Sequence, residues 1–226
     1  MQLNAARRER RACVLVTDVA GGAQRFVGAQ EMAGDPLADQ IEAALRAGKS
    51  GTVERDGVSY FLTVQVPPVR LVMIGAVHIS QALGPIARIA GLDPVVIDPR
   101  TAFASPERVP DTPVLAQWPD EALVARPLDR YTAICLLTHD PKIDDRALTR
   151  ALKAECFYIG ALGSRKTHAR RIERMQAEGF DEAALARIHA PIGLDIGAVS
   201  PAEIAVSIAG EIVAALRKKP LRSERS

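Results

Sequence analysis

The spacing of apolar residues along residues 11–66 predicts a small α+β domain. The expected order of elements is strand, strand, helix, strand, strand, and residues 12–17 and 60–66 are the clearest strands because they are rich in β-branched and apolar side chains. Pro67-Pro68 then interrupts helix and sheet alike, because proline lacks a backbone N–H and has a fixed φ. We therefore expect an N-terminal domain over residues 1–66.

Beyond the two prolines, short continuous apolar runs alternate with helical segments. Such runs are typical of a parallel sheet that helices cover on both faces. They occupy residues 71–74, 95–97, 132–137 and 157–159, with weaker candidates at 114–115 and 188–192. The pattern predicts a Rossmann-like, mostly parallel α/β domain over residues 69–218. Residues 219–226 are expected to form a disordered basic tail.

Capping residues mark where several helices are expected to begin. Asp35-Pro36 and Asp140-Pro141 each supply an N-cap followed by a first-turn proline. Residues 200–203 read Ser-Pro-Ala-Glu, which is a capping box. These signals predict helices directly after each of the three positions.

Glycine and proline mark where other elements are expected to end or bend. Gly48 is expected to end the helix after Asp35-Pro36, and Gly179 to end a helix that Ser164 begins. Asp56-Gly57 is a hairpin signal. Gly84-Pro85 lies inside an apolar helical pattern, so that helix is expected to be kinked or to begin late.

Composition narrows the class of protein without deciding its function. The 226 residues carry a formal net charge of +2 and only 4% aromatic residues, which disfavours nucleic-acid binding and base stacking. No apolar run is long enough to cross a membrane, and the basic start lacks the apolar stretch of a signal peptide. Cys13, Cys135 and Cys156 form no CxxC pair, so we expect buried thiols in a reducing, cytoplasmic compartment.

The turn after the first expected strand of the larger domain has the layout of a dinucleotide-binding motif. Gly75 follows that strand, and Asp98 closes the next strand 23 residues later. Val77 stands where the motif has a glycine, and its branched side chain would push a pyrophosphate outward. Three interpretations stay open: NAD(P) or FAD in the usual pose, a tight turn in which Asp98 bonds nearby backbone, and a different ligand over the same turn.

Polar residues follow three of the expected strands, and a parallel sheet would bring them to one edge, where ligands bind in open α/β sheets. The first loop holds Thr138, His139, Asp140, Lys142 and Asp144; the second holds Gly160, Gly163, Ser164, Arg165, Lys166 and His168; the third holds His189, Pro191, Gly193 and Asp195.

Two cations at the start of a helix suggest an anionic ligand. Arg165 and Lys166 lie in the first turn after Ser164, where the helix dipole disfavours positive charge. A phosphate that accepts hydrogen bonds from the backbone of residues 163–165 and from both side chains would offset this cost. The alternative is a solvated basic helix start, which Arg170 and Arg171 further along also support.

The histidines give weaker signals. His139 could act as a base oriented by Asp140, but Asp140 is already explained as an N-cap. His78, His168 and His189 show no spacing typical of metal ligands, so we expect no metal site built from protein side chains.

Several blocks in one order give a more specific signal than any single motif. They are IGAVH at residues 74–78, VIDPR at 96–100, FASPER at 103–108, LTHDPK at 137–142, GALGSRK at 160–166 and HAPIGLDIG at 189–197. Over about residues 71–216 the chain resembles the XdhC/CoxI family of accessory proteins for molybdenum hydroxylases such as xanthine dehydrogenase and carbon monoxide dehydrogenase.

The resemblance implies a chaperone that binds molybdenum cofactor (molybdopterin), protects it during sulfuration and inserts it into an apo molybdenum hydroxylase. It implies no catalytic residue, and it suggests a homodimer and a cysteine desulfurase as a further partner. The candidate cofactor-binding residues are Gly75, His78, Asp98, Arg100, Thr138, His139, Asp140, Lys142, Gly160, Gly163, Ser164, Arg165, Lys166, His189, Gly193 and Asp195, with Arg108 as a further candidate for anion contact.

The chain departs from the family pattern in two places. Val77 replaces a glycine that many members carry, and no Gly-Gly-Cys-x-Glu signature precedes Pro67. The second departure suggests a shortened member that works beside a separate XdhC N-domain protein. Two rival hypotheses stay open: an NAD(P)-dependent oxidoreductase that uses Gly75, Asp98 and His139, and a nucleotide-binding regulatory module without chemistry.

Overall fold

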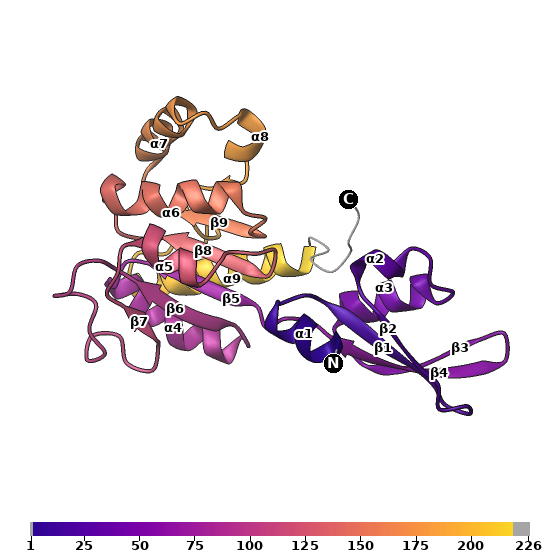
Figure 1. Cartoon of the computed structure of the whole chain (residues 1–226). Helices are drawn as coiled ribbons and strands as arrows, with labels where there is room; N and C mark the ends of the chain where they lie inside the picture. Colours follow the sequence, from indigo (N-terminus) through magenta and orange to yellow (C-terminus); the bar gives the residue numbers. More distant parts are fainter. Residues whose placement is uncertain (1, 219–226) are drawn as a thin grey trace. The chain divides into compact units, whose positions relative to one another are not determined.

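The computed structural model describes residues 2–218 (Figure 1). The chain divides into two compact units between Pro67 and Pro68. The basic tail expected over residues 219–226 lies outside the described residues. Within the described part of the chain, no helix is long and apolar enough to cross a membrane.

The smaller unit is a four-stranded antiparallel sheet with helices. Its elements are α1 (Gln2–Arg8), β1 (Cys13–Asp18), β2 (Gln24–Val27), α2 (Ala29–Met32), α3 (Ala38–Ala47), β3 (Gly51–Arg55) and β4 (Val58–Gln65). The strand order is β2-β1-β4-β3, and α3 packs on the central strands β1 and β4. The expected α+β pattern is confirmed. Helix α1 is an addition that the apolar pattern did not predict, because only its Ala6 is buried.

Helix α3 begins two residues after the predicted first turn. Its N-cap is Leu37, whose backbone N–H donates to Asp35 Oδ1 at 2.8 Å. The Asp35 carboxylate also forms a bidentate ion pair with Arg25, with both N···O distances at 2.8 Å. The prediction of Asp35 as the N-cap is therefore wrong, because this carboxylate joins α3 to β2. Gly48 ends the helix as predicted, with a left-handed φ of 64°.

The larger unit is an α/β fold with an all-parallel sheet. Its elements are β5 (Arg70–Ile74), α4 (His78–Ile89), β6 (Asp93–Ile97), β7 (Val114–Leu115), α5 (Pro119–Ala125), β8 (Thr132–Leu136), α6 (Pro141–Lys153), β9 (Tyr158–Ala161), α7 (Arg165–Ala177), α8 (Glu182–Leu185), β10 (Ile188–His189) and α9 (Pro201–Lys218). The strand order β10-β9-β8-β5-β6-β7 is the Rossmann order. Successive strands are added on one side of β5 up to β7 and on its other side from β8 onward, so the order reverses between the parallel strands β5 and β8. This confirms the predicted fold class.

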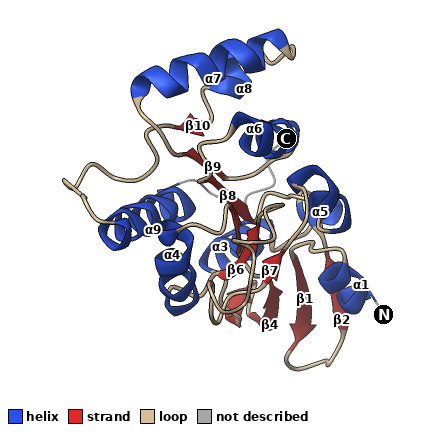
Figure 2. Cartoon of the chain, turned by 90° about the vertical axis from the view of Figure 1, so that its left-hand side faces the viewer, coloured by secondary structure: helices blue, strands red, loops and turns tan. Residues whose placement is uncertain are grey.

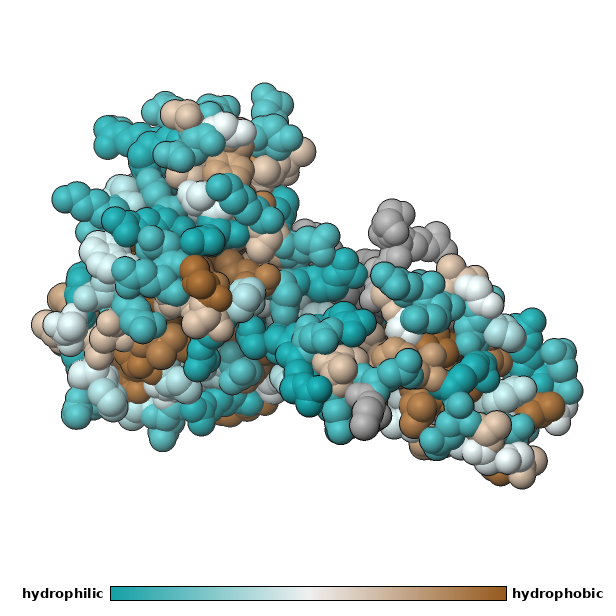
Figure 3. All heavy atoms as spheres, in the orientation of Figure 1, coloured by the Kyte–Doolittle hydropathy of each residue, from teal (hydrophilic) through white to brown (hydrophobic). Residues whose placement is uncertain are grey.

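Helices cover both faces of the parallel sheet (Figure 2). Helices α4 and α9 pack against each other on one face, and α6 packs between α5 and α7 on the other. The second face forms a continuous apolar core that includes Ile74 and Ile97 of the sheet and Leu148 of α6. Figure 3 shows that hydrophilic side chains cover most of the visible face of this unit around α7.

Helix α4 begins at His78 and continues through Pro85 to Ile89. Of the two predicted alternatives, the late start is therefore wrong and the kink stays a prediction. Gly84 explains why the proline is accommodated, since a residue without Cβ relieves the steric conflict with the following proline ring. Gly84 also packs against the loop that holds Thr112, because a Cβ there would collide with Thr112 Oγ1.

Several local signals of the larger unit are confirmed. Asp140 is the N-cap of α6 and accepts the Lys142 N–H at 2.9 Å. Glu203 accepts the backbone N–H groups of Val199 and Ser200, each at 2.8 Å, as a capping box requires. The predicted burial of the cysteines is also confirmed in both units, since Cys13 of the smaller unit and Cys135 and Cys156 of the larger one are free and buried.

Candidate functional site

The candidate site begins where β5 and β8 end side by side. Gly75 follows β5 with φ 112°, a conformation that residues with a side chain rarely adopt. A Cβ on Gly75 would lie only 2.8 Å from Cγ2 of Thr138, the residue that follows β8 and Leu137. Only glycine therefore lets the two loops approach this closely. In folds with this strand order, ligands bind in the crevice at this point.

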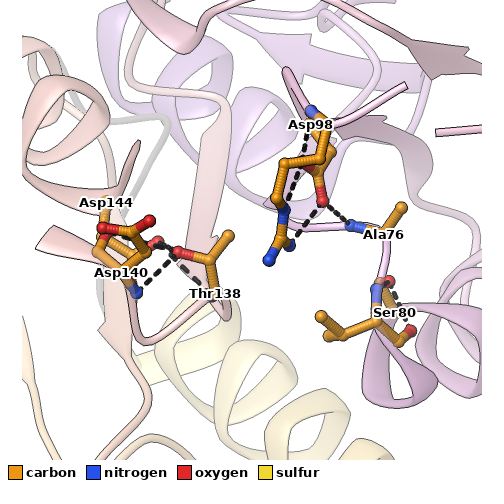
Figure 4. A network of polar contacts seen from close by, with 8 residues as sticks. Ala76, Ser80, Asp98, Thr138, Asp140 and Asp144 are labelled. Atoms are coloured by element: carbon orange, nitrogen blue, oxygen red, sulfur yellow. Dashed lines mark hydrogen bonds and ion pairs between the residues drawn. The ribbon is translucent and has the colours of Figure 1, made fainter. Parts of the chain in front are cut away.

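Asp98, at the end of β6, holds the neighbouring loops together. Its Oδ2 accepts hydrogen bonds from the Ala76 N–H at 2.8 Å and from Arg100 Nη2 at 2.7 Å. Its Oδ1 accepts the Arg100 N–H and Arg100 Nε, both at 2.9 Å. Figure 4 shows Asp98 above Ala76, across the crevice from Thr138. The carboxylate is 0% exposed and is fully used by these four donors.

This arrangement favours one interpretation of Asp98. Burial would raise the pKa of Asp98, but the hydrogen bonds from Arg100 and Ala76 outweigh it and lower the pKa below its ordinary value. A carboxylate that accepts four hydrogen bonds has no lone pair left for the hydroxyls of a ribose. Asp98 bonds the turn, as one of the three interpretations predicts, and its part in ligand binding stays a prediction.

Arg100 is oriented by Asp98 and stays partly open to solvent. The side chain of Arg100 is 33% exposed, and the carboxylates of Asp140 and Asp144 help to raise its pKa. Its guanidinium lies over the Phe103 ring at 4.6 Å, and the Arg108 guanidinium contacts the same ring at 5.0 Å. The structure thus brings together two arginines that the sequence proposed for anion contact.

The first turn of α4 lies beside this arginine. Ser80 Oγ accepts the Val77 N–H at 2.9 Å, and Asp98 accepts that of Ala76. Within residues 2–218, no group accepts the N–H of His78 or Ile79, which are the first two residues of the helix. The His78 side chain is exposed. This helix start therefore keeps unpaired amide donors at the crevice.

The loop after β8 forms the opposite wall (Figure 4). Thr138 Oγ1 donates to Asp144 Oδ1 at 2.7 Å and accepts the Asp140 N–H at 3.1 Å. His139 is exposed and has a left-handed φ of 61°, which is unusual for a residue with a side chain. Asp144 is 2% exposed, and burial raises its pKa to about 6 against the opposing hydrogen bonds from Thr138.

The predicted anion-binding start of α7 has the expected local geometry. Ser164 is the N-cap, and its Oγ accepts the Thr167 N–H at 3.2 Å. Gly163 has φ 129°, and a Cβ there would lie 3.0 Å from Thr167 Cγ2. Arg165 and Lys166 are exposed and have no ion-pair partner among the described residues. Their role in anion binding stays a prediction.

A buried arginine on α7 was not singled out in the sequence. Arg171 is 2% exposed, and its Nη2 donates to the Leu162 carbonyl at 2.9 Å. It lines a pocket of about 230 Å³ between α6 and α7, which we call the Arg171 pocket. Other lining residues are His139, Asp144, Thr167, Arg170 and Arg174. The available signal was its position four residues before the buried Met175, on the inward side of the helix.

His189 and Gly193 belong to a separate group at the edge of the sheet. Strand β10 is separated from β8 by β9, so these residues do not reach the crevice between β5 and β8. Glu211 of α9 accepts the Gly193 N–H at 2.7 Å and the Tyr158 hydroxyl at 2.5 Å, and its Oε1 lies 2.9 Å from His189 Nδ1. The three predicted loops therefore share one edge of the sheet without converging on one point.

This edge group is a partly buried polar network that ties α9 to the sheet. Burial opposes ionisation of Glu211, but the hydrogen bonds from His189, Tyr158 and Gly193 outweigh it and lower its pKa. Gly160 leaves room for Ile192, since a Cβ there would lie 2.5 Å from Ile192 Cδ1. Lys142 and Asp195 are exposed. No group of three or more His, Cys, Asp or Glu side chains in the described part could hold a metal ion.

Comparisons with known proteins agree with this fold and these motifs. The model of the XdhC Rossmann domain matches residues 71–212. YqeB of Escherichia coli (strain K12) is 30% identical over 163 residues, which are 72% of this chain and 30% of that protein. The molybdenum cofactor insertion chaperone PaoD, also of E. coli, is 30% identical over 146 residues, 65% of this chain and 40% of PaoD.

Two further proteins extend the comparison. A Bacillus subtilis (strain 168) protein, described as a probable subunit of xanthine dehydrogenase, is 28% identical over 148 residues, 65% of this chain and 43% of that protein. A crystal structure of a Bacillus halodurans protein, described as a xanthine dehydrogenase, covers 99% of this chain with a TM-score of 0.68 at 20% identity, and 65% of its own chain is matched. The chain thus spans less than half the length of these three curated relatives. Through its residues 71–212, the chain belongs to the XdhC family.

Proposed function

We propose that this protein binds molybdenum cofactor at the carboxyl edge of its parallel sheet and delivers it to an apo molybdenum hydroxylase of the xanthine dehydrogenase type. The carrying observation is the crevice between β5 and β8, where Asp98 fixes the Arg100 guanidinium next to the unpaired amides that begin α4. A relative with 30% identity is itself a molybdenum cofactor insertion chaperone, which supports the same role here.

The residues at the crevice fit the chemistry of this cofactor. Molybdenum cofactor is a pterin dithiolene that ends in a phosphate, sometimes extended by a nucleotide, so it offers anionic groups and many hydrogen-bonding atoms. Arg100, Arg108 and the N–H groups of His78 and Ile79 would hold anionic oxygens. His139, held exposed on its strained loop, and the Ser164–Lys166 turn would add further donors.

The protein's own part in this function is binding and protection, with no catalytic residue. Gly75 keeps the crevice narrow, and the Thr138–Asp144 hydrogen bond holds the loop after β8 in place. We propose that sulfuration and insertion depend on partners: a cysteine desulfurase, the apo-hydroxylase and a separate XdhC N-domain protein, with this chain acting as a homodimer in the cytoplasm. The relative described as part of a xanthine dehydrogenase supports the association with a hydroxylase.

Direct titration tests this proposal against the oxidoreductase alternative. The purified full chain is titrated with molybdenum cofactor released from a donor enzyme, and separately with NAD(H) and NADP(H). We expect saturable cofactor binding and no comparable nicotinamide affinity, because Asp98 has no free lone pair for a ribose. Tight nicotinamide binding with hydride transfer, and no pterin binding, would reject the chaperone function.

A charge variant tests the predicted contribution of α7. Arg165→Ala with Lys166→Ala should weaken cofactor binding several-fold and leave the thermal midpoint almost unchanged, because both side chains are exposed. The matched control is Arg150→Ala with Lys153→Ala, which removes two exposed cations from the last turn of α6. Equal affinity in both double variants would remove cofactor recognition from the start of α7.

A further inference from the structure

Arg171 carries buried donors that no group in the described chain accepts. Its Nη2 donates to Leu162, but Nε and Nη1 have no acceptor within residues 2–218. These two nitrogens carry three of the five N–H hydrogens of the guanidinium. An unpaired, buried, charged donor is costly, and burial lowers the pKa of Arg171 below its ordinary value. The position therefore calls for an acceptor from outside the described chain.

The charges around the Arg171 pocket leave cations that are not neutralised. Arg174 is already engaged with Asp145 through two hydrogen bonds of 2.5 and 3.0 Å. Arg170 is exposed and lines the pocket without an ion-pair partner among the described residues. Arg171 and Asp144 line the same pocket, yet no ion pair joins them. The pocket thus has an inner and an outer guanidinium available to an anion.

Two carboxylates line the pocket, and Asp145 is paired with Arg174, so Asp144 is the one without an ion-pair partner among the described residues. Its Oδ1 accepts the Thr138 hydroxyl, and its Oδ2 has no hydrogen-bond partner within residues 2–218. Because burial raises the pKa of Asp144 to about 6, this group takes up a proton more readily than an ordinary aspartate. A protonated Asp144 can donate a hydrogen bond to an oxygen of the ligand.

We propose that the Arg171 pocket binds a phosphate group, with Arg171 as its inner donor and Arg170 as its outer cation. The tetrahedral oxygens of a phosphate provide acceptors for several N–H groups at once, which suits a guanidinium better than a single carbonyl does. The pocket of about 230 Å³ is also far larger than one water molecule needs. The exposed Arg165 and Lys166 are not among the residues that line this pocket.

The ligand is a phosphate group, and two molecules could supply it. One is the terminal phosphate of the molybdenum cofactor, and this source rests on the proposed function. The other is free inorganic phosphate, which would bind whether or not the protein carries the cofactor. His139 lines the Arg171 pocket and follows β8 by three residues, so this pocket adjoins the loop that forms one wall of the crevice.

Inorganic phosphate alone tests the site in the full chain. The protein is labelled with 15N-arginine, and the Nε–H resonances are followed during a phosphate titration. We expect saturable binding that shifts the Arg171 resonance, which is identified by its absence in Arg171→Lys. That variant should bind phosphate at least tenfold more weakly, because lysine offers a point charge in place of a planar guanidinium. Arg150→Ala with Lys153→Ala, which removes two exposed cations outside the pocket lining, should keep the affinity within about twofold.

The titration is done on the parent chain, and Arg170→Ala, at an exposed position of the pocket lining, is a second variant that should weaken phosphate binding if Arg171→Lys does not fold. No saturable shift up to about 10 mM phosphate, on the order of the weak millimolar range, would overturn the inference. Unchanged affinity in a folded Arg171→Lys variant would overturn it as well. An Asp144→Asn variant should bind phosphate at least as tightly as the parent, since it keeps the Thr138 acceptor and loses the opposing charge.

Treating the released cofactor with a phosphatase distinguishes the two sources. If the cofactor phosphate occupies the pocket, the intact cofactor displaces inorganic phosphate and the treated cofactor does not. If the pocket binds free phosphate, inorganic phosphate and the intact cofactor bind at the same time, and Arg171→Lys leaves the cofactor affinity unchanged. A chain that binds phosphate through Arg171 and binds no cofactor would reject the proposed function and leave the phosphate site standing.

Discussion

Replacing Gly75 by alanine would perturb the contact between the loops that follow β5 and β8. The residue has φ 112°, and an added Cβ would lie 2.8 Å from Cγ2 of Thr138. Two costs therefore combine: the backbone conformation is unfavourable for alanine, and the methyl group collides with a side chain whose Oγ1 is fixed by Asp144. Thr138 cannot turn away without breaking that hydrogen bond.

The expected loss of stability is about 2–4 kcal/mol. Unfavourable backbone conformations cost roughly 1–3 kcal/mol and overpacking roughly 1–3 kcal/mol. The lower backbone entropy of alanine in the unfolded chain returns about 0.4–1 kcal/mol. Domains of this size have unfolding free energies of about 5–15 kcal/mol, so the variant should still fold.

Urea unfolding followed by tryptophan fluorescence measures this loss in the larger unit alone. The chain has one tryptophan, Trp118, and it lies at the start of α5. Gly91→Ala is the matched control, because Gly91 has φ 77° and no atom within 4 Å of an added Cβ. It should cost about 1 kcal/mol, the backbone contribution without the collision.

The collision itself is tested by a double-mutant cycle. Thr138→Ser removes Cγ2 and keeps the hydroxyl that bonds Asp144. In that background Gly75→Ala should cost about 1–2 kcal/mol less than in the parent. Additive losses, with no coupling between the two changes, would refute the close contact between Gly75 and Thr138 as the source of the effect.

Three further changes test other parts of the structure. Asp98→Asn should lower the unfolding free energy by about 3–5 kcal/mol, because it leaves Arg100 and the Ala76 N–H without an anionic acceptor; an unchanged urea midpoint would contradict this. The pKa of Asp144 is raised to about 6, so its stabilising contribution is present below about pH 3.8 and is lost as pH rises through 6. In urea titrations the unfolding free energy of Asp144→Asn should therefore rise relative to that of the parent by up to about 3 kcal/mol between pH 4 and 7. A pH-independent difference would be inconsistent with this. Burial raises the pKa of the Cys156 thiol to about 12 and raises that of Cys135 as well, so Ellman's reagent should label neither within minutes at pH 8 unless urea is added.

Sequence patterns were sufficient to place the parallel sheet. The strands β5, β6, β8 and β9 contain continuous apolar runs, and such runs are visible without knowledge of their neighbours. The capping signals at Asp140 and at residues 200–203 were equally local, and both were confirmed. Asp35 is not the N-cap because α3 begins only after Leu37, and its carboxylate accepts the Leu37 N–H together with Arg25 of β2. Local sequence patterns do not show such contacts between segments that are distant in the chain.

The same limit explains the candidate site. The spacing of Gly75 and Asp98 was visible, but only the folded chain shows that Arg100 and Ala76 use all the acceptor capacity of Asp98. Arg171 resembled its exposed neighbours in a basic helix, because its burial depends on how α7 packs beside α6. Glu211 lies in the long C-terminal helix without any motif, and its partners come from β9 and the loop after β10.

The pairing of Asp98 with Arg100 has a consequence for the proposed function. Because Asp98 supplies the counter-ion of the arginine, we expect that an anionic ligand could leave without stranding an unpaired charge in the loop. Because Asp98 already orders the Arg100 side chain, binding of an anionic ligand costs little side-chain entropy there. In the proposed function, the empty site would therefore keep the geometry that binds the cofactor.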